Sequence, residues 1–241
     1  MEGSKKRRKR YGGAAQGNRR ATISRFLYDI EPEFVDSKHL CAAARKRGYI
    51  HNLPIENSAK LTERIQCALA SSGNPPPKSD HTRGVGKTER FKSLGNSFQV
   101  DTVAYHLSVL KDMYPNGVNV LSLFTGIGGG EVALHRLGIH MKTVVSVEIG
   151  EVNRRILRGW WDQTQTGTLI EIADVKSLTD DRIATFVRRF GGFDLVIGGS
   201  PCNNLAGSNR HHRDGLEGEQ SALFYHYFRI VDAVKSAMGR M

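Results

Sequence analysis

The second part of the chain alternates short β-branched runs with amphipathic segments, and this alternation restricts the fold more than any other feature. From about residue 97 it predicts a helix over Val100–Leu110, a turn at Pro115–Gly117 and a strand over Val118–Phe124. Further strands are expected at 144–148, 168–173 and 195–197, and helices at 130–137, 152–161, 180–189 and about 221–234. Strands that alternate with helices form a parallel sheet covered on both faces. The sequence therefore predicts a doubly wound α/β domain.

The residues before this domain are less regular. Residues 1–21 are basic and rich in glycine and alanine, so we expect a disordered tail. Helical spacing of apolar residues predicts a helix near 23–30, and an Asp36-Ser37 cap predicts a short helix through Cys41 and Ala44. Ser58–Ala70 is expected to be helical, and 71–87 has the composition of a linker. We divide the chain into 1–21, 22–92 and 93–241.

The net charge of +11 and the pI near 9.8 favour a polyanionic partner, nucleic acid before an acidic membrane. The basic run Lys5–Arg10 is typical of a nuclear-import signal, of a phosphate-binding arm or of a solvated tail. No apolar run approaches the roughly 18 residues of a membrane span. Cys41, Cys67 and Cys202 lack metal-ligand spacing, so the sequence predicts no metal site and a reducing compartment.

A glycine-rich turn joins the first strand of the domain to its helix. Glycine lets the backbone approach a ligand closely, and the helix N-terminus offers free N–H groups. Phe124 is expected to stack on a nucleotide-like cofactor, or to be an ordinary core aromatic. Backbone contacts to the cofactor are expected from Thr125, Gly126, Ile127 and Gly128. The alternative is a glycine turn without a ligand.

Two acidic residues end the next strands. Glu148 is expected to bind ribose hydroxyls and Asp174 an adenine amino group. The dinucleotide fingerprint is not matched, because Glu131 stands where its last glycine belongs. The turn alone does not separate a nicotinamide cofactor from S-adenosylmethionine, but the Pro201-Cys202 element favours S-adenosylmethionine.

The sequence around Cys202 predicts a tight turn. The apolar run 193–197 is followed by Gly198–Asn204, so a buried strand is expected to end in a turn that presents this cysteine. A rigid position of this kind suits a nucleophile. The competing interpretation is a buried free cysteine.

Several motifs, taken in order, resemble a known family. They are Leu121–Gly130, Val147–Ile149, Asp174-Val175, Gly199–Asn203 and Leu223–Tyr225, and they resemble the successive core motifs of DNA cytosine-5 methyltransferases. Ser93–Val100 resembles the motif that normally closes those enzymes, yet here it comes first. This order is similar to that of the plant domains-rearranged de novo methyltransferases. The resemblance implies a Rossmann-like S-adenosylmethionine-dependent fold, circularly permuted, which is tolerable because domain termini lie close together.

The resemblance also implies roles for individual residues. Cys202 would attack carbon 6 of a cytosine in DNA while S-adenosylmethionine supplies the methyl group. The segment with Asn96, Ser97 and Phe98 would return to the cofactor, although Asn-Ser also suits a helix cap before Val100. DNA contacts are expected from Arg45, Arg47, Arg210 and Arg213, with plain surface charge as the alternative. The implied setting is the plant nucleus and epigenetic silencing.

Two family segments differ in this chain. The target-recognition region between Pro54 and Lys92 is truncated, and residues 1–21 contain no Glu-Asn-Val segment to hold the cytosine. We therefore expect the chain to bind cofactor and to methylate DNA poorly or not at all. One alternative is an inactive accessory paralogue that binds DNA, a partner methyltransferase or a silencing subunit. A weaker one is an RNA methyltransferase.

Overall fold

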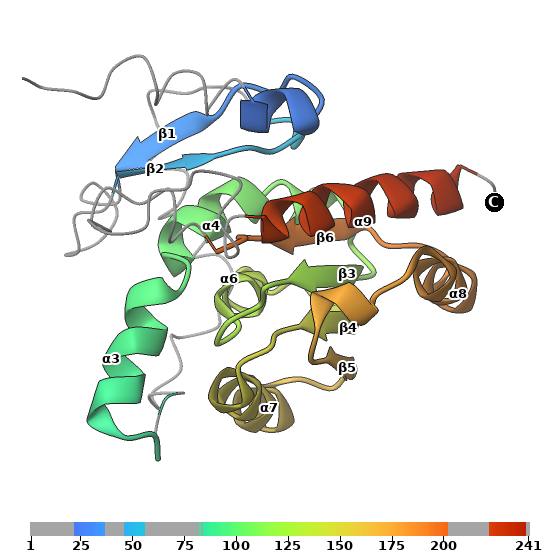
Figure 1. The fold of residues 1–241 in the computed structure, drawn as a ribbon. Coiled ribbons are helices and arrows are strands. Elements are labelled where there is room, and N and C mark those ends of the chain that lie inside the picture. The colour runs from blue at the N-terminus through green and yellow to red at the C-terminus, as the bar shows by residue number, and fades with distance from the viewer. Residues whose placement is uncertain (1–21, 37–45, 56–81, 83, 202–221, 240–241) are drawn as a thin grey trace, which may run out of the picture.

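A computed structural model of the chain describes residues 22–36, 46–55, 82, 84–201 and 222–239 (Figure 1). Its centre is a parallel sheet of four strands in the order β5-β4-β3-β6. The strands are β3 (Val118–Leu123), β4 (Met141–Val147), β5 (Thr168–Ile172) and β6 (Leu195–Gly198). All four predicted strands are confirmed, with small shifts at their ends. The strand order reverses between β3 and β6, and open α/β sheets bind ligands at the carboxyl ends of strands beside such a reversal.

Helices cover both faces of the sheet, as predicted. On one face α4 (Val100–Leu107), α6 (Gly129–Arg136) and α7 (Glu151–Thr164) pack on a cluster that includes Val120. On the other face α8 (Asp180–Phe190) and α9 (Leu223–Met238) pack on a cluster that includes Leu121. Side chains alternate between the two faces along β3, and all six residues of that strand are buried. The doubly wound fold is therefore confirmed.

The predicted helix over Val100–Leu110 is interrupted in the structure. The first helix, α4, ends at Leu107, and α5 (Leu110–Met113) is a separate short helix. The predicted turn at Pro115–Gly117 is present, and Gly117 has a φ of +91°. A Cβ at this position would lie 2.6 Å from the carbonyl oxygen of His140, so only glycine fits.

The structure corrects one prediction near the N-terminus. Residues 22–26 are helical, but positive φ angles at Tyr28 and Asp29 end this helix earlier than predicted. Asp36 ends β1 (Glu33–Asp36), which pairs antiparallel with β2 (Lys46–Tyr49). Ser37 and the predicted helix through 41–44 lie outside the described residues, so the expected Asp36-Ser37 cap stays a prediction.

A further helix, α3 (Lys87–Asn96), begins inside the region that we expected to be a linker. It presents Phe91 and Leu94 to solvent, so it lacks the amphipathic pattern by which the sequence would reveal a helix. The predicted helix over 58–70 lies outside the described residues.

The N-terminal segment packs against the last helix. The ring of Phe26 makes edge-to-face contacts with Phe224, Tyr225 and Phe228 of α9, at centroid distances of 6.2, 5.4 and 5.2 Å. The hydroxyl of Tyr28 donates to Asp232 at 3.3 Å. Segments about 200 positions apart therefore lie side by side. None of the described helices is long and apolar enough to cross a membrane.

Candidate active site

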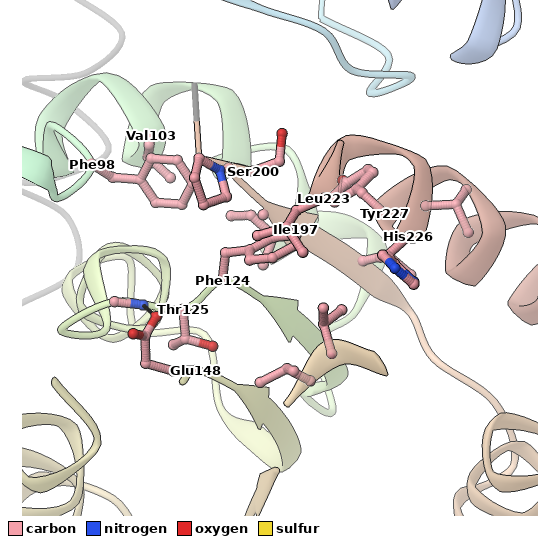
Figure 2. Close-up of a pocket in the computed structure, with 18 of the residues that line it drawn as sticks. Phe98, Val103, Phe124, Thr125, Glu148, Ile197, Ser200, Leu223, His226 and Tyr227 are labelled. Atoms are coloured by element: carbon pink, nitrogen blue, oxygen red, sulfur yellow. Dashed lines mark hydrogen bonds between the residues drawn. The ribbon is translucent and has the colours of Figure 1, made fainter. Parts of the chain in front are cut away.

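A cavity of about 1340 Å³ lies where the carboxyl ends of the four strands meet the segment between α3 and α4. Figure 2 shows Phe98 and Ser200 on one side, Thr125 and Glu148 on the other, and Phe124 and Ile197 between them. Eight of the expected cofactor residues line this cavity: Asn96, Ser97, Phe98, Phe124, Thr125, Gly126, Glu148 and Asp174. Ile127 and Gly128 are not among the residues that line it, and Ile127 is buried behind the turn.

The turn after β3 has an unusual backbone. Phe124 has a φ of +55°, in the left-handed region that non-glycine residues rarely adopt, and Gly126 and Gly128 have φ values of +61° and +86°. Such strain persists only where the surrounding structure holds it, and it is concentrated at ligand sites. The ring of Phe124 packs at the edge of the core cluster around Leu121 and also lines the cavity. The stacking role and the core role predicted for Phe124 are therefore compatible.

Thr125 locks this turn to the sheet. Its side chain is buried, and its hydroxyl donates to the carbonyl of Ser122 at 2.9 Å and accepts from Ser146 at 3.0 Å. Its backbone N–H donates to the carbonyl of Val147 at 3.1 Å. These bonds fix the turn between β3 and β4.

Glu148, the first residue after β4, is the centre of a hydrogen-bond network. Its Oε2 accepts from the backbone N–H of Gly126 at 2.9 Å, and its Oε1 accepts from Gly150 N–H at 2.8 Å and from Asn153 Nδ2 at 3.0 Å. Asn153 in turn accepts a hydrogen bond from the hydroxyl of Ser93 in α3 at 3.0 Å. The carboxylate is thus held in one orientation by the turn, by α7 and indirectly by α3.

Sequence reasoning missed three of the residues around Glu148. Asn153 and Ser93 support its side chain, and the signal for Asn153 was its place in the first turn of α7. Ile149, the second residue after β4, is 76% exposed and lines the cavity. Its backbone carbonyl accepts from Arg154 at 2.8 Å, as does that of Glu148.

Asp174 lies after β5 at the same edge of the sheet. Its Oδ1 accepts from the backbone N–H of Lys176 at 2.9 Å and caps a single turn of 3₁₀ helix, Val175–Ser177. Part of its hydrogen-bonding capacity is therefore used locally. The residue nevertheless lines the cavity beside Glu148 and Ile149.

Phe98 brings the segment between α3 and α4 into contact with two glycine turns. A Cβ on Gly129, at the start of α6, would lie 3.1 Å from the Cβ of Phe98. A Cβ on Gly199, after β6, would lie 3.2 Å from its ring. The helix cap that we allowed for Asn96-Ser97 is wrong, because these residues end α3 and Gln99 caps α4 by accepting from Thr102 N–H at 2.5 Å.

The turn after β6 leads into the expected nucleophile. Gly199, Ser200 and Pro201 line the cavity, and the next residue along the chain is Cys202. Cys202 itself lies outside the described residues, as do Arg45, Arg210 and Arg213. Arg47 is described: it lies in β2 opposite Val35 and lines the cavity.

Tyr227 of α9 lies against this turn. A Cβ on Gly198 would lie 2.8 Å from its ring. Burial raises the pKa of the Tyr227 hydroxyl to about 12. Lys235 of the same helix also lines the cavity.

Comparison with known proteins finds one family and several relatives. The C-5 cytosine-specific DNA methylase family matches residues 118–238, which contain the sheet and the expected nucleophile. The chain is 71% identical over 218 residues to "DNA (cytosine-5)-methyltransferase DRM1A" of Oryza sativa subsp. japonica, with 90% of this chain and 42% of the relative covered. It is 58% identical over 296 residues to DRM2 of the same organism, with 90% and 50% covered. The chain thus spans half the length, or less, of these curated relatives.

The lengths of these alignments differ. The DRM1A alignment is hardly longer than the 90% of the 241-residue chain that it includes, so it contains few gaps. The DRM2 alignment includes the same share of the chain but is much longer, so DRM2 has residues with no counterpart here. A third relative, "Probable inactive DNA (cytosine-5)-methyltransferase DRM3" of the same organism, is 34% identical, with 91% of this chain and 44% of the relative covered.

Proposed function

Because the chain belongs to the C-5 cytosine-specific DNA methylase family, we propose that it transfers a methyl group from S-adenosylmethionine to carbon 5 of cytosine in DNA. The observation that carries this proposal is the convergence on one cavity of the turns after β3, β4, β5 and β6. The segment with Phe98, which precedes the sheet in the sequence, reaches the same cavity. A cofactor, a base and a thiolate could meet in such a place.

The residues of the cavity fit S-adenosylmethionine. Gly126 allows close approach of the backbone, and the fixed carboxylate of Glu148 is a suitable acceptor for ribose hydroxyls. Exposed Ile149 offers an apolar surface for the adenine ring, and Asp174 an acceptor for its amino group. Phe124 and Phe98 supply aromatic surface on the other side. When bound, S-adenosylmethionine supplies an electrophilic methyl group.

Cys202 is assigned as the nucleophile. Addition of its thiolate to carbon 6 of cytosine moves the electrons of the 5,6 double bond toward carbon 5, which then becomes nucleophilic. Loss of the carbon 5 proton later expels the thiolate and restores the double bond. The target base must leave the helical stack to reach the cavity, which costs a few kcal/mol of unstacking.

Arginines and the net positive charge support DNA as the substrate. Arg47 lines the cavity from β2, and we assign phosphate or base contacts to Arg45, Arg47, Arg210 and Arg213. We further propose that the protein acts in a plant nucleus, where the basic run Lys5–Arg10 serves import. The accessory alternative is not favoured, because the relatives at 71% and 58% identity are named as methyltransferases, whereas DRM3 of Oryza sativa subsp. japonica, a probable inactive relative matched over 91% of this chain, is only 34% identical.

The test is methyl transfer to unmethylated duplex DNA by the full chain with labelled S-adenosylmethionine. We use enzyme in excess over DNA and long incubation, so that a single turnover is detected. Label is expected on cytosine carbon 5 and is expected to disappear in Cys202→Ser. Cys67→Ser serves as the matched control and should retain transfer. Label on RNA but not on DNA, or undiminished transfer by Cys202→Ser, would contradict the proposal.

A further inference from the structure

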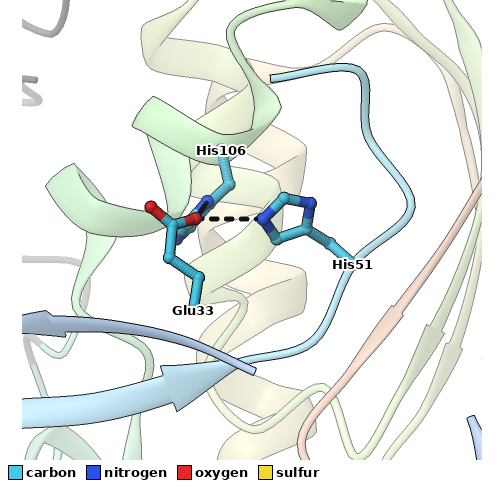
Figure 3. A group of neighbouring side chains, drawn as sticks. All are labelled: Glu33, His51 and His106. Carbon is cyan, nitrogen blue, oxygen red and sulfur yellow. Dashed lines mark hydrogen bonds and ion pairs between the residues drawn. The ribbon is translucent and has the colours of Figure 1, made fainter. Parts of the chain in front are cut away.

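Three side chains that methyl transfer does not use meet where the N-terminal hairpin joins the body of the protein. Glu33 comes from β1, His51 follows β2, and His106 lies in α4 (Figure 3). One carboxylate oxygen and two imidazole nitrogens from these residues lie within 4.8 Å of one another. This set of donor atoms is one that divalent transition metals bind.

The distances fit a metal centre. Oε2 of Glu33 lies 3.1 Å from Nε2 of His51 and 3.5 Å from Nδ1 of His106. Zinc bonds of about 2.0–2.2 Å to nitrogen and oxygen place neighbouring ligands of a tetrahedral site about 3.3–3.6 Å apart. The two measured separations therefore match edges of a zinc coordination tetrahedron within a few tenths of an ångström.

His106 gives an independent indication of a missing partner. Its side chain is only 6% exposed, and neither of its ring nitrogens has a hydrogen-bond partner among the described residues. Its Nδ1 has only the 3.5 Å contact to the carboxylate of Glu33. Buried polar atoms without a partner are rare in native proteins because they lose their hydration without replacement. Coordination of a metal ion would give this nitrogen a partner.

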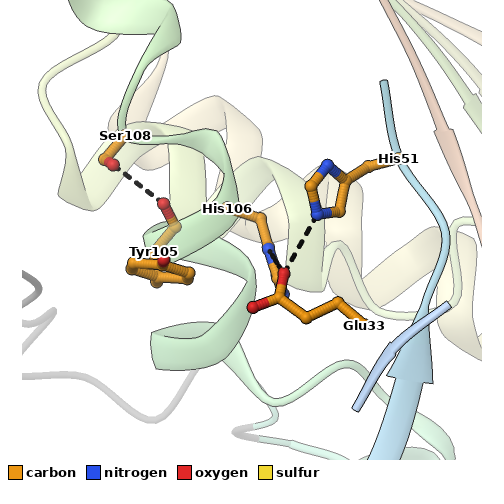
Figure 4. Close-up of polar contacts among 5 residues, drawn as sticks. All are labelled: Glu33, His51, Tyr105, His106 and Ser108. Atoms are coloured by element: carbon orange, nitrogen blue, oxygen red, sulfur yellow. Dashed lines mark hydrogen bonds and ion pairs between the residues drawn. The ribbon is translucent and has the colours of Figure 1, made fainter. Parts of the chain in front are cut away.

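The surroundings hold His106 in place. The rings of Tyr49 and His51 pack against it at centroid distances of 4.8 and 4.9 Å. The nearby Ser108 hydroxyl donates to the backbone carbonyl of Tyr105 within α4 (Figure 4).

We propose that Glu33, His51 and His106 bind one zinc ion that fastens the β1–β2 hairpin to α4. Three protein ligands leave the fourth position of the tetrahedron for a water molecule. Because the ligands come from three separate segments, the ion would fix the position of β2 and hence of Arg47 at the cavity. The sequence did not reveal the site, because the three ligands are separated by long intervals and follow no recognised spacing.

The first test is cobalt titration of the full chain after treatment with a chelator. Cobalt replaces zinc in such sites and has a visible spectrum that reports its geometry. We expect one equivalent to bind with the intense absorption of a four-coordinate site, without a cobalt–thiolate charge-transfer band, and to be displaced by zinc. A variant with Cys41, Cys67 and Cys202 all replaced by serine should bind equally well. A thiolate band, or loss of binding in that variant, would overturn the proposal.

The second test uses ligand variants. Glu33→Gln preserves the size of the side chain, and His106→Ala removes the buried imidazole; each is expected to weaken binding by more than about 100-fold, since loss of mere outer-shell partners costs 10–100-fold. His140→Ala, at an exposed histidine outside the cluster, is the control and should bind as the wild type does. Circular dichroism checks that each variant is folded. Absence of stoichiometric binding by the folded wild type, or undiminished binding by folded Glu33→Gln, would refute the proposal.

Discussion

The sheet body and the N-terminal hairpin are held in place by different means. In the body, β3 is buried along its whole length between two apolar clusters, and its helices follow their strands closely in sequence. In the β1–β2 hairpin Val35 is buried but the neighbouring Phe34 is 45% exposed. Contacts to α9 and α4 position this part: Phe26 packs on Phe224, and Glu33 meets His106.

This difference shows why one part of the fold was predictable and the other was not. The sheet body can be predicted from local sequence, because each of its strands and helices has its own hydrophobic period. Each of these elements also packs against elements that are near to it in the sequence. The segment that leads into the hairpin depends on partners such as Asp232, which lies 204 positions from Tyr28. Such contacts leave no periodic signal.

Leu157→Ala should destabilise the protein most. Leu157 is fully buried in the cluster on the α7 face, and removing a buried leucine side chain costs about 2–5 kcal/mol of unfolding free energy. Chemical denaturation measures this. Leu94→Ala, at a leucine that is 41% exposed on α3, is the matched control and should change stability by less than about 0.5 kcal/mol. Equal losses would mean that the body is not the principal source of stability.

Gly128→Ala should cost more than Gly126→Ala. Both glycines have positive φ, which costs an alanine about 1–2 kcal/mol. At Gly128 the added Cβ would also lie 2.6 Å from Leu157 Cδ1, whereas nothing lies within 4 Å at Gly126. Overpacking adds typically 1–3 kcal/mol. Equal stabilities of the two variants would show that the turn is not packed rigidly onto α7.

Alkaline pH should affect the body through Tyr227. The pKa of Tyr227 is about 12 in the folded protein and about 10 in the unfolded chain, so its contribution is complete below pH 10 and is lost as pH rises through 12. A loss of about 2 kcal/mol of stability is expected over this range and should be smaller in Tyr227→Phe. Tyr28→Phe should reduce the slope less than Tyr227→Phe does, because Tyr28 is 43% exposed and its pKa is raised by weaker burial and by Asp232. The same slope in Tyr227→Phe would contradict this assignment.

Phe26→Ala should have the smallest global effect. Phe26 contributes edge-to-face contacts worth about 0.5–1.5 kcal/mol each, but the segment that carries it can detach without unfolding of the sheet. Hydrogen exchange should accelerate at residues 22–30 and stay unchanged in β3. Faster exchange throughout β3 would mean that the two regions unfold as one unit.

Some features of the candidate site were predictable from the sequence and others were not, for the same reason as in the fold. Phe124, Gly126, Glu148 and Asp174 were predictable, because each follows a strand of a recognisable parallel sheet and strand ends meet at one edge. The indirect support of Glu148 by Ser93 was not predictable, since the hydrogen bond from Ser93 to Asn153 spans 60 positions and joins two helices. The cluster around His106 escaped for the same reason, because its three ligands come from a hairpin, a loop and a helix.

Calorimetry of S-adenosylmethionine binding tests whether the ends of the strands form a cofactor site around Glu148. The full chain should bind one equivalent, and Glu148→Gln should weaken binding by about 1–3 kcal/mol, the value of a charge-assisted hydrogen bond. Glu171→Gln is the matched control: Glu171 pairs with Arg158 on β5, does not line the cavity, and its loss should leave affinity unchanged. Absence of binding by the folded chain, or equal affinities of wild type and Glu148→Gln, would contradict the account.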